Sequence, residues 1–312
     1  MSASPKISII LPTYSRRRVL PRTIASVVAQ DEQDFELIVV DDCSVDDTRA
    51  YLASLTDPRI RVVRPPHNVG TAGARNLGLE AARADVVALL DDDDIYLEHR
   101  LSAPLAAFAR DPEVVATLSS SVKVDLKRTH VAKMPDLTLP PAAFEWALIC
   151  DLVGVEGTSI TVRTRTAREI GGFARGMKWI DDREFLIRAS RLGAGRLIAA
   201  PLWQKHWSED SQSNQWAQAG HSLLSYIAAR PEFVGQFRKM GSYLATKILV
   251  SDLRHGMFGA LARDLRDFRK AGLIDGNVVR MWREHREVRQ YRRAMSKPEA
   301  LAGLTRAPDD WR

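Results

Sequence analysis

The sequence predicts an α/β fold in which helices flank a mostly parallel β-sheet, with a helical extension at the C-terminus. In the first half of the 312-residue chain, apolar runs of strand length alternate with segments of helical periodicity. Two of these runs end in adjacent acids, at Asp41-Asp42 and at Asp91 to Asp94. In open α/β sheets ligands bind beyond the carboxyl ends of the strands, so the two acidic ends mark the expected site.

The composition is that of a soluble globular protein. Hydrophobic residues make up 45% and charged residues 27% of the chain. Cys43 and Cys150 are the only cysteines, which argues against a disulfide framework or a cysteine zinc site. The N-terminal residues show no signal-peptide pattern, and no apolar run approaches the roughly 18 residues of a membrane span. We therefore expect a cytoplasmic protein.

Each element of the first half has a basis in the sequence. Short, mostly apolar runs predict buried strands, and apolar residues at every third or fourth position predict helices. Pro12 ends the first strand, and Asp46 and Asp47 favour a helix start because the helix dipole stabilises acids there. In chain order we expect a strand over 6–11, a helix over 19–30, a strand over 36–40, a helix over 46–55, a strand over 60–63, a segment over 68–78 that leads into a helix running to about 84, a strand over 86–90, a helix over 97–109 and a strand over 114–118.

The second half contains fewer strands and then becomes entirely helical. Alternation of apolar and polar residues predicts a strand over 158–163, and a mostly apolar run predicts another over 195–201. A helix is expected over 144–152. After about residue 215 only helical spacing remains, and it predicts helices over 221–229, 243–253, 257–268 and 278–291.

Four adjacent carboxylates, Asp91, Asp92, Asp93 and Asp94, follow the strand expected over 86–90. Like charges this close repel one another and destabilise the fold unless something neutralises them. A divalent cation would do so because hard cations take oxygen ligands, so a metal site is one interpretation. The other interpretation is a solvated acidic turn that caps the helix expected from residue 97.

The glycines of the first half do not form a familiar nucleotide-binding loop. Gly70, Gly73 and Gly78 do not match the dinucleotide pattern Gly-x-Gly-x-x-Gly, and no such run follows the first strand. A phosphate-binding Gly-Lys-Ser/Thr loop is absent as well. A nucleotide bound at this sheet would therefore need a metal to neutralise its phosphates.

Four motifs occur in a fixed order along the first half. They are Ile-Ser-Ile-Ile-Leu-Pro-Thr-Tyr at 7–14, Val-Val-Asp-Asp-Cys-Ser-Val-Asp-Asp-Thr at 39–48, Asn-Val-Gly-Thr-Ala-Gly-Ala-Arg-Asn-Leu-Gly at 68–78 and Leu-Leu-Asp-Asp-Asp-Asp at 89–94. Together they closely resemble the nucleotide-sugar-binding domain of family 2 glycosyltransferases, inverting enzymes with the GT-A fold. Each motif alone is weak, but the order and spacing of all four are specific. The resemblance covers about Lys6 to Ser213.

The resemblance implies donor-binding roles for residues at matching positions. Asp42 would hydrogen-bond the nucleobase, and Asp41 would be structural. Asp91-x-Asp93 matches the family's Asp-x-Asp motif, in which Asp93 would bind Mn²⁺ or Mg²⁺ together with the diphosphate. Asp91 or Asp92 would face the ribose, since the run of four acids leaves the register open by one residue. The loop lining the base would be Pro12, Thr13 and Tyr14, and the pair facing the nucleotide would be Arg75 and Asn76.

Further motifs match the acceptor half of the family. Gly171-Gly172-Phe173 resembles its Gly-Gly-Phe turn, and Asp181-Asp182 resembles the Glu-Asp pair that opens the catalytic helix, with Asp181 in place of the usual Glu. The resemblance makes Asp182 the general base. Without the resemblance, Asp181 and Asp182 are explained as an acid pair at a helix N-terminus, which the helix dipole stabilises. His206 stands where the family often places a metal-binding histidine, although a lone histidine is more often structural.

The net charge of +6 lies entirely in the C-terminal part of the chain. From Arg254 to Arg312 there are 14 Lys/Arg and 8 Asp/Glu, and the preceding residues hold equal numbers of each sign. A basic segment suggests an anionic partner. Three alternatives stay open for the extension: it covers the active site, joins two copies into a homo-oligomer, or lies on the anionic inner face of a membrane. Its modest apolar face favours packing on the protein itself.

These features together predict a metal-dependent, inverting glycosyltransferase that moves a sugar from a nucleoside-diphosphate sugar to an acceptor hydroxyl. The cofactor would be Mn²⁺ or Mg²⁺, and the acceptor a saccharide or a lipid-linked molecule in polysaccharide or glycoconjugate synthesis; we expect no nucleic-acid partner. Residues 1–214 would form the transferase domain, with a donor half (1–124) and an acceptor half (125–214), and 215–312 the helical extension. The alternatives are a sugar-phosphate nucleotidyltransferase, which would need a Gly-rich basic loop after the first strand, and a non-catalytic nucleotide-binding protein with a basic tail.

Overall fold

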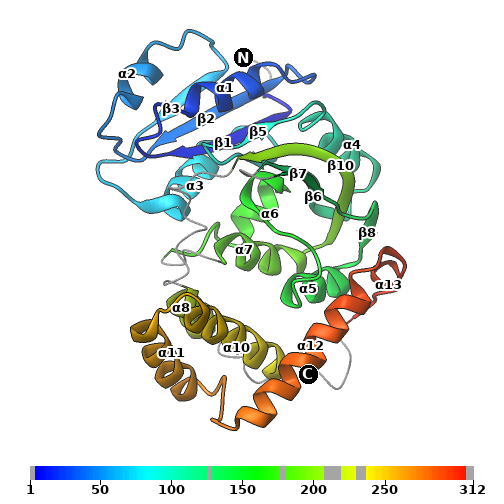
Figure 1. The fold of residues 1–312 in the computed structure, drawn as a ribbon. Coiled ribbons are helices and arrows are strands. Elements are labelled where there is room, and N and C mark those ends of the chain that lie inside the picture. Colours follow the sequence, from blue (N-terminus) through cyan, green and yellow to red (C-terminus); the bar gives the residue numbers. More distant parts are fainter. Residues whose placement is uncertain (1–3, 125–127, 176–179, 207–218, 230–236, 307–312) are drawn as a thin grey trace.

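A mixed β-sheet of ten strands lies at the centre of the molecule (Figure 1). We describe it from a computed structural model, in residues 4–124, 128–175, 180–206, 219–229 and 237–306. Across the sheet the strands are β3 (Ile60–Val63), β2 (Phe35–Asp41), β1 (Ile7–Thr13), β4 (Val86–Leu89), β9 (Thr161–Arg163), β6 (Val114–Val124), β10 (Ala194–His206) and β5 (Ile95–Tyr96), with β7 (Thr129–Ala132) beside β6 and β8 (Leu137–Leu139) beside β10. β1 to β4 are mutually parallel, which confirms the predicted parallel first half.

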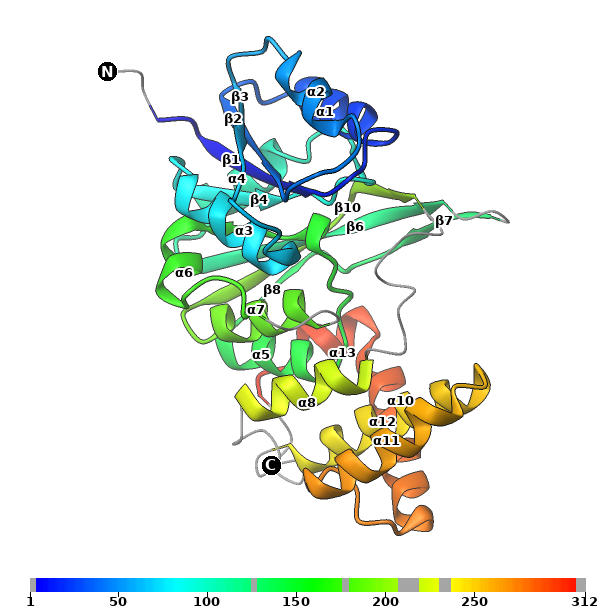
Figure 2. The ribbon, with the colours of Figure 1, turned by 90° about the vertical axis from the view of Figure 1, so that its left-hand side faces the viewer.

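Helices cover both faces of this sheet (Figures 1 and 2). Side chains alternate along a strand, so Ile9 of β1 packs into the core on one face and Ile10 into the core on the other. The first core is completed by α1 (Leu20–Val28), α2 (Thr48–Ala53) and α4 (Ser102–Arg110), and the second by α3 (Gly70–Ala81), α5 (Pro141–Ile149), α6 (Thr164–Glu169) and α7 (Asp181–Ser190).

Two predicted elements begin later than the sequence suggested. The helix expected from residue 97 starts at Ser102, because β5 still pairs with β10 and Leu97 N–H donates to Leu202 O at 2.9 Å. The strand expected over 158–163 opens as a single 3₁₀ turn, η1 (Gly157–Ser159), and only its last three residues pair in the sheet. Both differences arise from contacts with distant parts of the chain, which local periodicity does not encode.

Two strands extend well beyond their predicted ends. The runs expected over 114–118 and 195–201 become β6 and β10, which pair in parallel as far as Val124 and His206. The register shifts near Pro201, and this pairing holds polar runs in both strands, Ser119 to Ser121 of β6 and Gln204 to His206 of β10. The consequence is that β10 carries His206 to the same edge of the sheet as the acids after β4.

The described residues beyond 218 are helical, as predicted. The extension consists of α8 (Ala219–Ala229), α10 (Arg238–Arg254), α11 (Phe258–Lys270), α12 (Val278–Met295) and α13 (Pro298–Ala302). The boundary predicted at residue 214 falls in 207–218, outside the described residues. No helix in the described part of the chain combines the length and the apolar character that crossing a bilayer requires.

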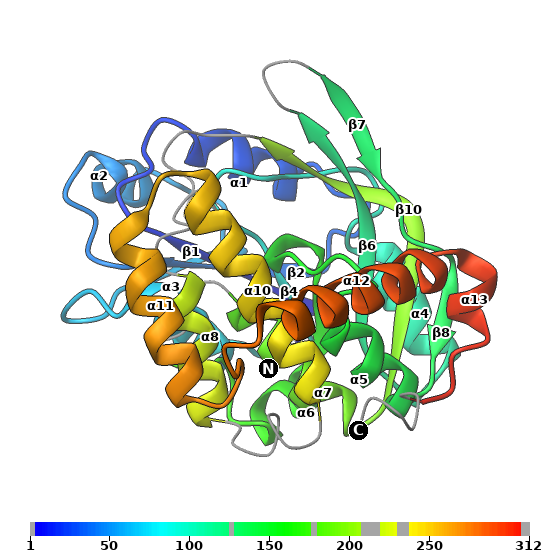
Figure 3. The ribbon, with the colours of Figure 1, turned by 60° about the horizontal axis from the view of Figure 1, so that its bottom comes forward.

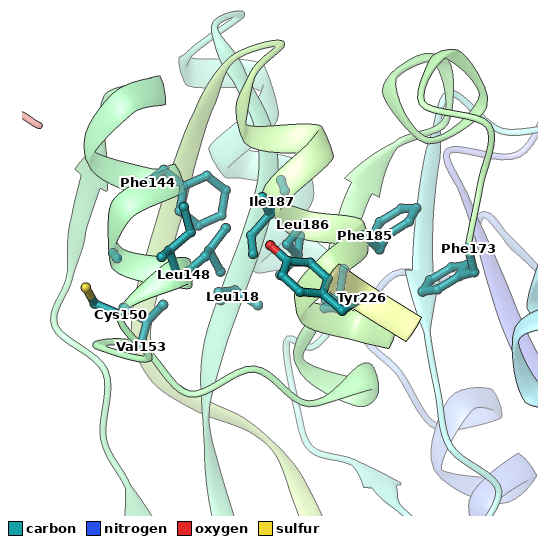
Figure 4. Packing of buried hydrophobic residues seen from close by; sticks show 14 of the residues in the cluster. Leu118, Phe144, Leu148, Cys150, Val153, Phe173, Phe185, Leu186, Ile187 and Tyr226 are labelled. Carbon is teal, nitrogen blue, oxygen red and sulfur yellow. The ribbon is translucent and has the colours of Figure 1, made fainter. Parts of the chain in front are cut away.

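The extension shares a core with the rest of the protein. Tyr226 of α8 belongs to the same hydrophobic cluster as Phe144 of α5 and Ile187 of α7 (Figure 4). Trp146 of α5 packs its ring against Phe237, with centroids 5.6 Å apart, and its indole N–H donates to the Tyr291 hydroxyl of α12 at 2.8 Å. The helices therefore pack on the protein itself, through an interface that is apolar at its centre.

Candidate active site

The residues predicted to line the nucleobase lie together at the carboxyl ends of β1 and β2. Asp42 N–H donates to the Thr13 carbonyl at 2.9 Å, which fixes the two strand ends side by side. Pro12 is the penultimate residue of β1, and the Tyr14 ring is about half exposed just beyond it. The sheet register thus brings these four side chains to one edge.

The Asp42 carboxylate is buried and held by the first turn of α3. Its two oxygens accept the Val69 N–H at 2.7 Å and the Gly70 N–H at 2.8 Å, so it satisfies donors that the helix start would otherwise leave unpaired. Asp41 beside it is fully buried and paired with Arg64. The pair therefore locks β2 to α3 and to the loop after β3.

The acids after β4 occupy two different environments. Asp94 points inward: it is fully buried, and its carboxylate accepts the Thr158 hydroxyl at 2.5 Å. Asp91 N–H donates to the same hydroxyl oxygen at 3.1 Å. Burial, and then the charge of Asp91, raise the pKa of Asp94 well above its ordinary value. Asp94 therefore anchors the strand end to the η1 turn.

Asp92 and Asp93 face the opposite way, toward Arg16 in the loop after β1. The Arg16 guanidinium lies 3.6 Å from the Asp92 carboxylate and 3.8 Å from that of Asp93. Burial, and then the adjacent Asp93 charge, raise the pKa of Asp92 to about 7. The repulsion expected from the sequence is therefore present in the fold, and Arg16 at these distances offsets it only in part.

Asp93 and His206 fit the donor chemistry of a divalent cation. Burial, and then the charge of Arg22, lower the pKa of His206, and this favours the neutral imidazole that binds metals. The Asp93 carboxylate is close enough to His206 to act on the same pKa, which it raises. Within the described ranges, no group of three His, Cys, Asp or Glu side chains is placed to hold an ion. Mg²⁺ in nucleotide sites is usually bound by one or two side chains plus substrate phosphates, so two donors are compatible with such an ion.

Arg75 of α3 joins the acids after β4 to those that open α7. One terminal nitrogen donates to Asp182 at 2.7 Å and to Asp181 at 3.0 Å, and the other donates to Asp91 at 2.9 Å. Its side chain is only 4% exposed, and its guanidinium lies over the Phe173 ring, 5.2 Å from the centroid. These three carboxylates raise the pKa of Arg75 although burial acts to lower it, so the arginine stays charged.

Asp181 and Asp182 occupy the first turn of α7, as predicted. Burial raises the pKa of both carboxyl groups, and the Arg75 guanidinium acts to lower both. For Asp182, the charge of Asp181 acts to raise the pKa as well, and the result is a pKa of about 7. A buried carboxylate that titrates near neutrality can both accept and release a proton, the property required of a general base. Asp92 also has a pKa of about 7, but of these two acids only Asp182 opens α7 and bonds to Arg75.

Asn76 holds the Gly-Gly-Phe turn instead of pointing into open space. Its amide donates to the Phe173 carbonyl at 2.9 Å and its oxygen accepts the Phe173 N–H at 2.7 Å. Gly172 lies against this pair with φ +70°, and a Cβ there would stand 2.4 Å from the Asn76 oxygen. The Phe173 ring stacks on Phe185 of α7 at 4.2 Å, so Asn76 fixes the turn that precedes the acid pair.

Sequence reasoning missed two features of the site. Gly157 lies against Arg75, and a Cβ there would stand 2.4 Å from an Arg75 terminal nitrogen, so only glycine fits. The second feature is Lys205 of β10, whose ammonium lies 3.8 Å from the Glu156 carboxylate. Burial acts to lower the pKa of Lys205, but Glu156 and the acids after β4 raise it above the ordinary value. Lys205 therefore adds a positive charge to the site. The position of Lys205 next to His206 on one strand could have suggested it, whereas nothing local marks Gly157.

The sequence matches the family model described as glycosyl transferase family 2 over residues 8–166, just over half of the chain. It is 36% identical over 143 residues to the succinoglycan biosynthesis protein ExoO of Rhizobium meliloti, covering 44% of this chain and 41% of that protein. It is 34% identical over 105 residues to the UDP-Glc:alpha-D-GlcNAc-diphosphoundecaprenol beta-1,3-glucosyltransferase WfgD of Escherichia coli, covering 34% and 42%. The matches thus span about two fifths of the length of these relatives.

Solved structures of glycosyltransferases share the fold. S. aureus TarS 1–349 in complex with UDP-GlcNAc superposes with a TM-score of 0.59 at 21% identity, covering 96% of this chain and 84% of that one. The mannosyltransferase PcManGT of Pyrobaculum calidifontis, in complex with GDP-Man and Mn²⁺, superposes with a TM-score of 0.57 at 18% identity, covering 97% and 86%. The expected GT-A fold is confirmed.

Proposed function

This chain belongs to glycosyl transferase family 2, and we propose that it transfers a sugar from a nucleoside-diphosphate sugar to an acceptor hydroxyl. The transfer is a metal-dependent single displacement that inverts the anomeric carbon. The acceptor oxygen forms the new glycosidic bond, the bond to the diphosphate breaks, and the acceptor proton goes to a carboxylate.

The observation that best supports this proposal is the cluster around Arg75. An inverting displacement needs a base on one side of the sugar and the departing diphosphate on the other. Asp182 opens α7, Asp91 follows β4 on the donor side, and Arg75 bonds to both. The buried Arg75 guanidinium thus holds Asp182 and Asp91 at a fixed separation, which is the positioning that such a reaction requires.

Asp182 is the general base in this proposal. Its pKa near 7 lies close to the working pH, where a base is most effective. Arg75 acts on it as a positioning residue: it orients the carboxylate and favours the ionised form. The acceptor hydroxyl would have to come within about 2.6–3.2 Å of the free oxygen of Asp182, or reach it through one water.

Asp93 and His206 would hold Mn²⁺ or Mg²⁺. When bound, the ion would neutralise the diphosphate as a Lewis acid and orient it. Arg16, which already contacts Asp93, and Lys205 place two further positive charges at this edge of the sheet. These cations stabilise the charge that builds up on the departing diphosphate.

We assign the remaining donor residues from what their polar groups already contact. Asp42, with Pro12, Thr13 and Tyr14, lines the nucleobase. Asp92 faces the ribose, because one Asp91 oxygen is engaged by Arg75. The two terminal nitrogens of Arg75 and the side-chain amide of Asn76 are engaged by protein, so these two residues support the donor site from behind instead of touching the nucleotide.

The acceptor is a saccharide or a lipid-linked saccharide used in polysaccharide synthesis. ExoO is described as a protein of succinoglycan biosynthesis, and WfgD as an enzyme acting on a diphosphoundecaprenol-linked sugar. Both descriptions support this chemical class of acceptor.

A thermal-shift panel followed by a nucleotide-release assay tests the proposal. UDP, GDP and their glucose, N-acetylglucosamine and mannose conjugates are added with and without MnCl₂, because a ligand that binds only the folded state raises its melting temperature by mass action. We expect one nucleotide class to stabilise the protein in a Mn²⁺-dependent manner. On addition of a lipid extract, we expect the nucleoside diphosphate to be released from the matching sugar donor as the sugar passes to the acceptor. Stabilisation by none of these donors would contradict the proposal.

A further inference from the structure

Helix α12 is held on the protein by one side only. Its buried residues include Glu284 and Val288, and the Tyr291 hydroxyl accepts the Trp146 indole N–H. Arg238 of α10 donates to the Glu284 carboxylate at 2.6 Å, which fixes the first half of the helix. These contacts set the rotation of α12 about its axis, and so determine which residues face outward.

The outward side forms a continuous stripe along the helix. Its members recur at intervals of three or four residues, which places them on one face of an α-helix. At about 1.5 Å per residue the stripe is roughly 21 Å long. Figures 1 and 3 show α12 on the outside of the helical extension, on the side of the molecule away from β1 to β3. All of its residues are exposed, and we call them the α12 stripe: Val279, Trp282, Arg283, Arg286, Arg289 and Arg293.

The α12 stripe carries a positive charge that the protein does not neutralise. Arg286, Arg289 and Arg293 form no ion pair with any carboxylate in the described part of the chain, and Arg283 reaches Glu287 only at 4.0 Å. Glu287 is shared with Lys239 of α10, at 3.6 Å. Four other arginines of the extension do have an ion-pair partner: Arg280 pairs with Asp275, Arg263 with Asp264, Arg266 with Asp267 and Arg292 with Asp151.

Large apolar side chains sit at one end of the same stripe. Trp282 is 54% exposed and Val279 is 80% exposed, although exposing their apolar surface to water costs free energy. Tryptophan is enriched where one part of a side chain meets hydrocarbon and the other meets water. Nucleic acid would account for the arginines but not for an exposed valine beside them, whereas an anionic bilayer surface accounts for both.

We propose that the α12 stripe docks this protein on an anionic lipid bilayer, with α12 lying parallel to the surface. The arginines contact lipid headgroups, and Trp282 and Val279 enter the interface at the N-terminal end of the helix. The docking does not depend on the transfer reaction. It would hold the proposed transferase at the surface where a lipid-linked acceptor resides.

Vesicle co-sedimentation with matched charge variants tests the proposal. The test variant is Arg286→Gln, Arg289→Gln, Arg293→Gln. The control variant is Arg49→Gln, Arg110→Gln, Arg165→Gln, which removes the same charge from exposed arginines without described ion pairs elsewhere. On vesicles of one-third phosphatidylglycerol we expect the test variant to lose roughly 100-fold in partitioning, about fivefold per arginine, and the control to stay within a few-fold of wild type.

The apolar end has its own readout. Lipids brominated in the acyl chain should quench part of the protein fluorescence, and Trp282→Phe should remove that quenching while leaving the melting temperature unchanged. Salt should weaken binding of the wild type, since screening acts on the arginine contacts.

Three results would overturn the docking proposal: no binding of the wild type to anionic vesicles, equal loss in the test and control variants, or tight binding to duplex DNA or RNA in the absence of vesicle binding. None of these depends on catalysis. A variant that loses vesicle binding but keeps Mn²⁺-dependent nucleotide binding would separate this proposal from that of the transferase.

Discussion

At the scale of single residues, two adjacent acids have different roles in the proposed reaction. Asp182 and Asp181 both bond to Arg75, at 2.7 and 3.0 Å, and both open α7. We expect Asp182→Asn to keep donor and metal binding but to lower the transfer rate by roughly 10²–10⁴-fold, the usual contribution of a general base. The measurement is the transfer rate with the donor identified by the binding panel, alongside calorimetry of that donor.

Asp181→Asn is the matched control, because it removes an acid from the same turn and the same arginine. We expect it to lower the rate much less, since its role is to support the turn. If Asp182→Asn binds the donor normally and transfers sugar within a few-fold of the wild-type rate, Asp182 is not the general base. Asp181 would then be the next candidate.

Arg75 should control the pH dependence of the reaction. Asp182 acts as a base only when ionised, so activity should rise with pH through about 7. Arg75 lowers the pKa of Asp182, and its removal should move the acidic limb of the rate profile to higher pH. We therefore expect Arg75→Met to show the shifted limb and Arg75→Lys, which keeps a cation, to shift it less.

The pH profile of transfer distinguishes this role from simple structural support. A lower rate at every pH with an unmoved limb would show that Arg75 does not act on the base. If Arg75→Met does not fold, the comparison of Arg75→Lys with wild type still reports the position of the limb.

At the scale of elements, the η1 turn fixes the distance between the two halves of the site. A Cβ on Gly157 would stand 2.4 Å from an Arg75 nitrogen and 3.2 Å from both Asp91 carboxylate oxygens. Arg75 cannot move away freely because three carboxylates hold it. We expect Gly157→Ala to lower transfer by at least about tenfold, since small misplacements of catalytic groups have large effects, and to cost about 1–3 kcal/mol of stability.

Gly154→Ala is the control for this substitution, because a Cβ there would meet only the Met134 side chain at 3.9 Å. Rates and melting temperatures of both alanine variants should be compared with wild type. Equal behaviour of the two would mean that the close approach at Gly157 has no consequence.

The helical extension contains an unfavourable acid pair between α10 and α11. Asp252 is fully buried, and burial together with the nearby Asp264 carboxylate raises its pKa to about 6. Because the folded pKa lies above the unfolded one, the stability that Asp252 contributes is present at low pH and is lost as pH rises through about 6. We expect Asp252→Asn to raise the melting temperature at pH 8 by roughly 2–4 °C, and by less at pH 5.

Asp267→Asn on α11 is the control for the buried pair. Asp267 is paired with Arg266 at 3.0 Å and its pKa is lowered by that contact, so its replacement should bring no gain at pH 8. A gain for Asp252→Asn that is equal at pH 5 and pH 8 would contradict the assignment of a charged carboxylate to the folded state.

At the scale of the whole molecule, the sequence predicted the parallel first half well because three of its four strands, β1, β2 and β4, are almost entirely buried and read as apolar runs. β1 to β4 each lie within two residues of the expected bounds. The late start of α4 could not be predicted, because it depends on the pairing of β5 with β10, about 100 residues away. The link between Asp91 and Asp182 was equally hidden: Arg75 and Asp182 are 107 positions apart, and only the fold brings them within 2.7 Å.

The central claim is that the carboxyl edge of this sheet binds a nucleoside-diphosphate sugar through a metal, and calorimetry of UDP and GDP tests it most directly. Each nucleotide is titrated into wild type and into Asp93→Asn, with MnCl₂ and with EDTA. We predict binding of one nucleotide to the wild type only in the presence of Mn²⁺, and its loss in Asp93→Asn with an unchanged melting temperature. Metal-dependent binding of the same affinity in Asp93→Asn, or no binding of either nucleotide by the wild type, would contradict the account.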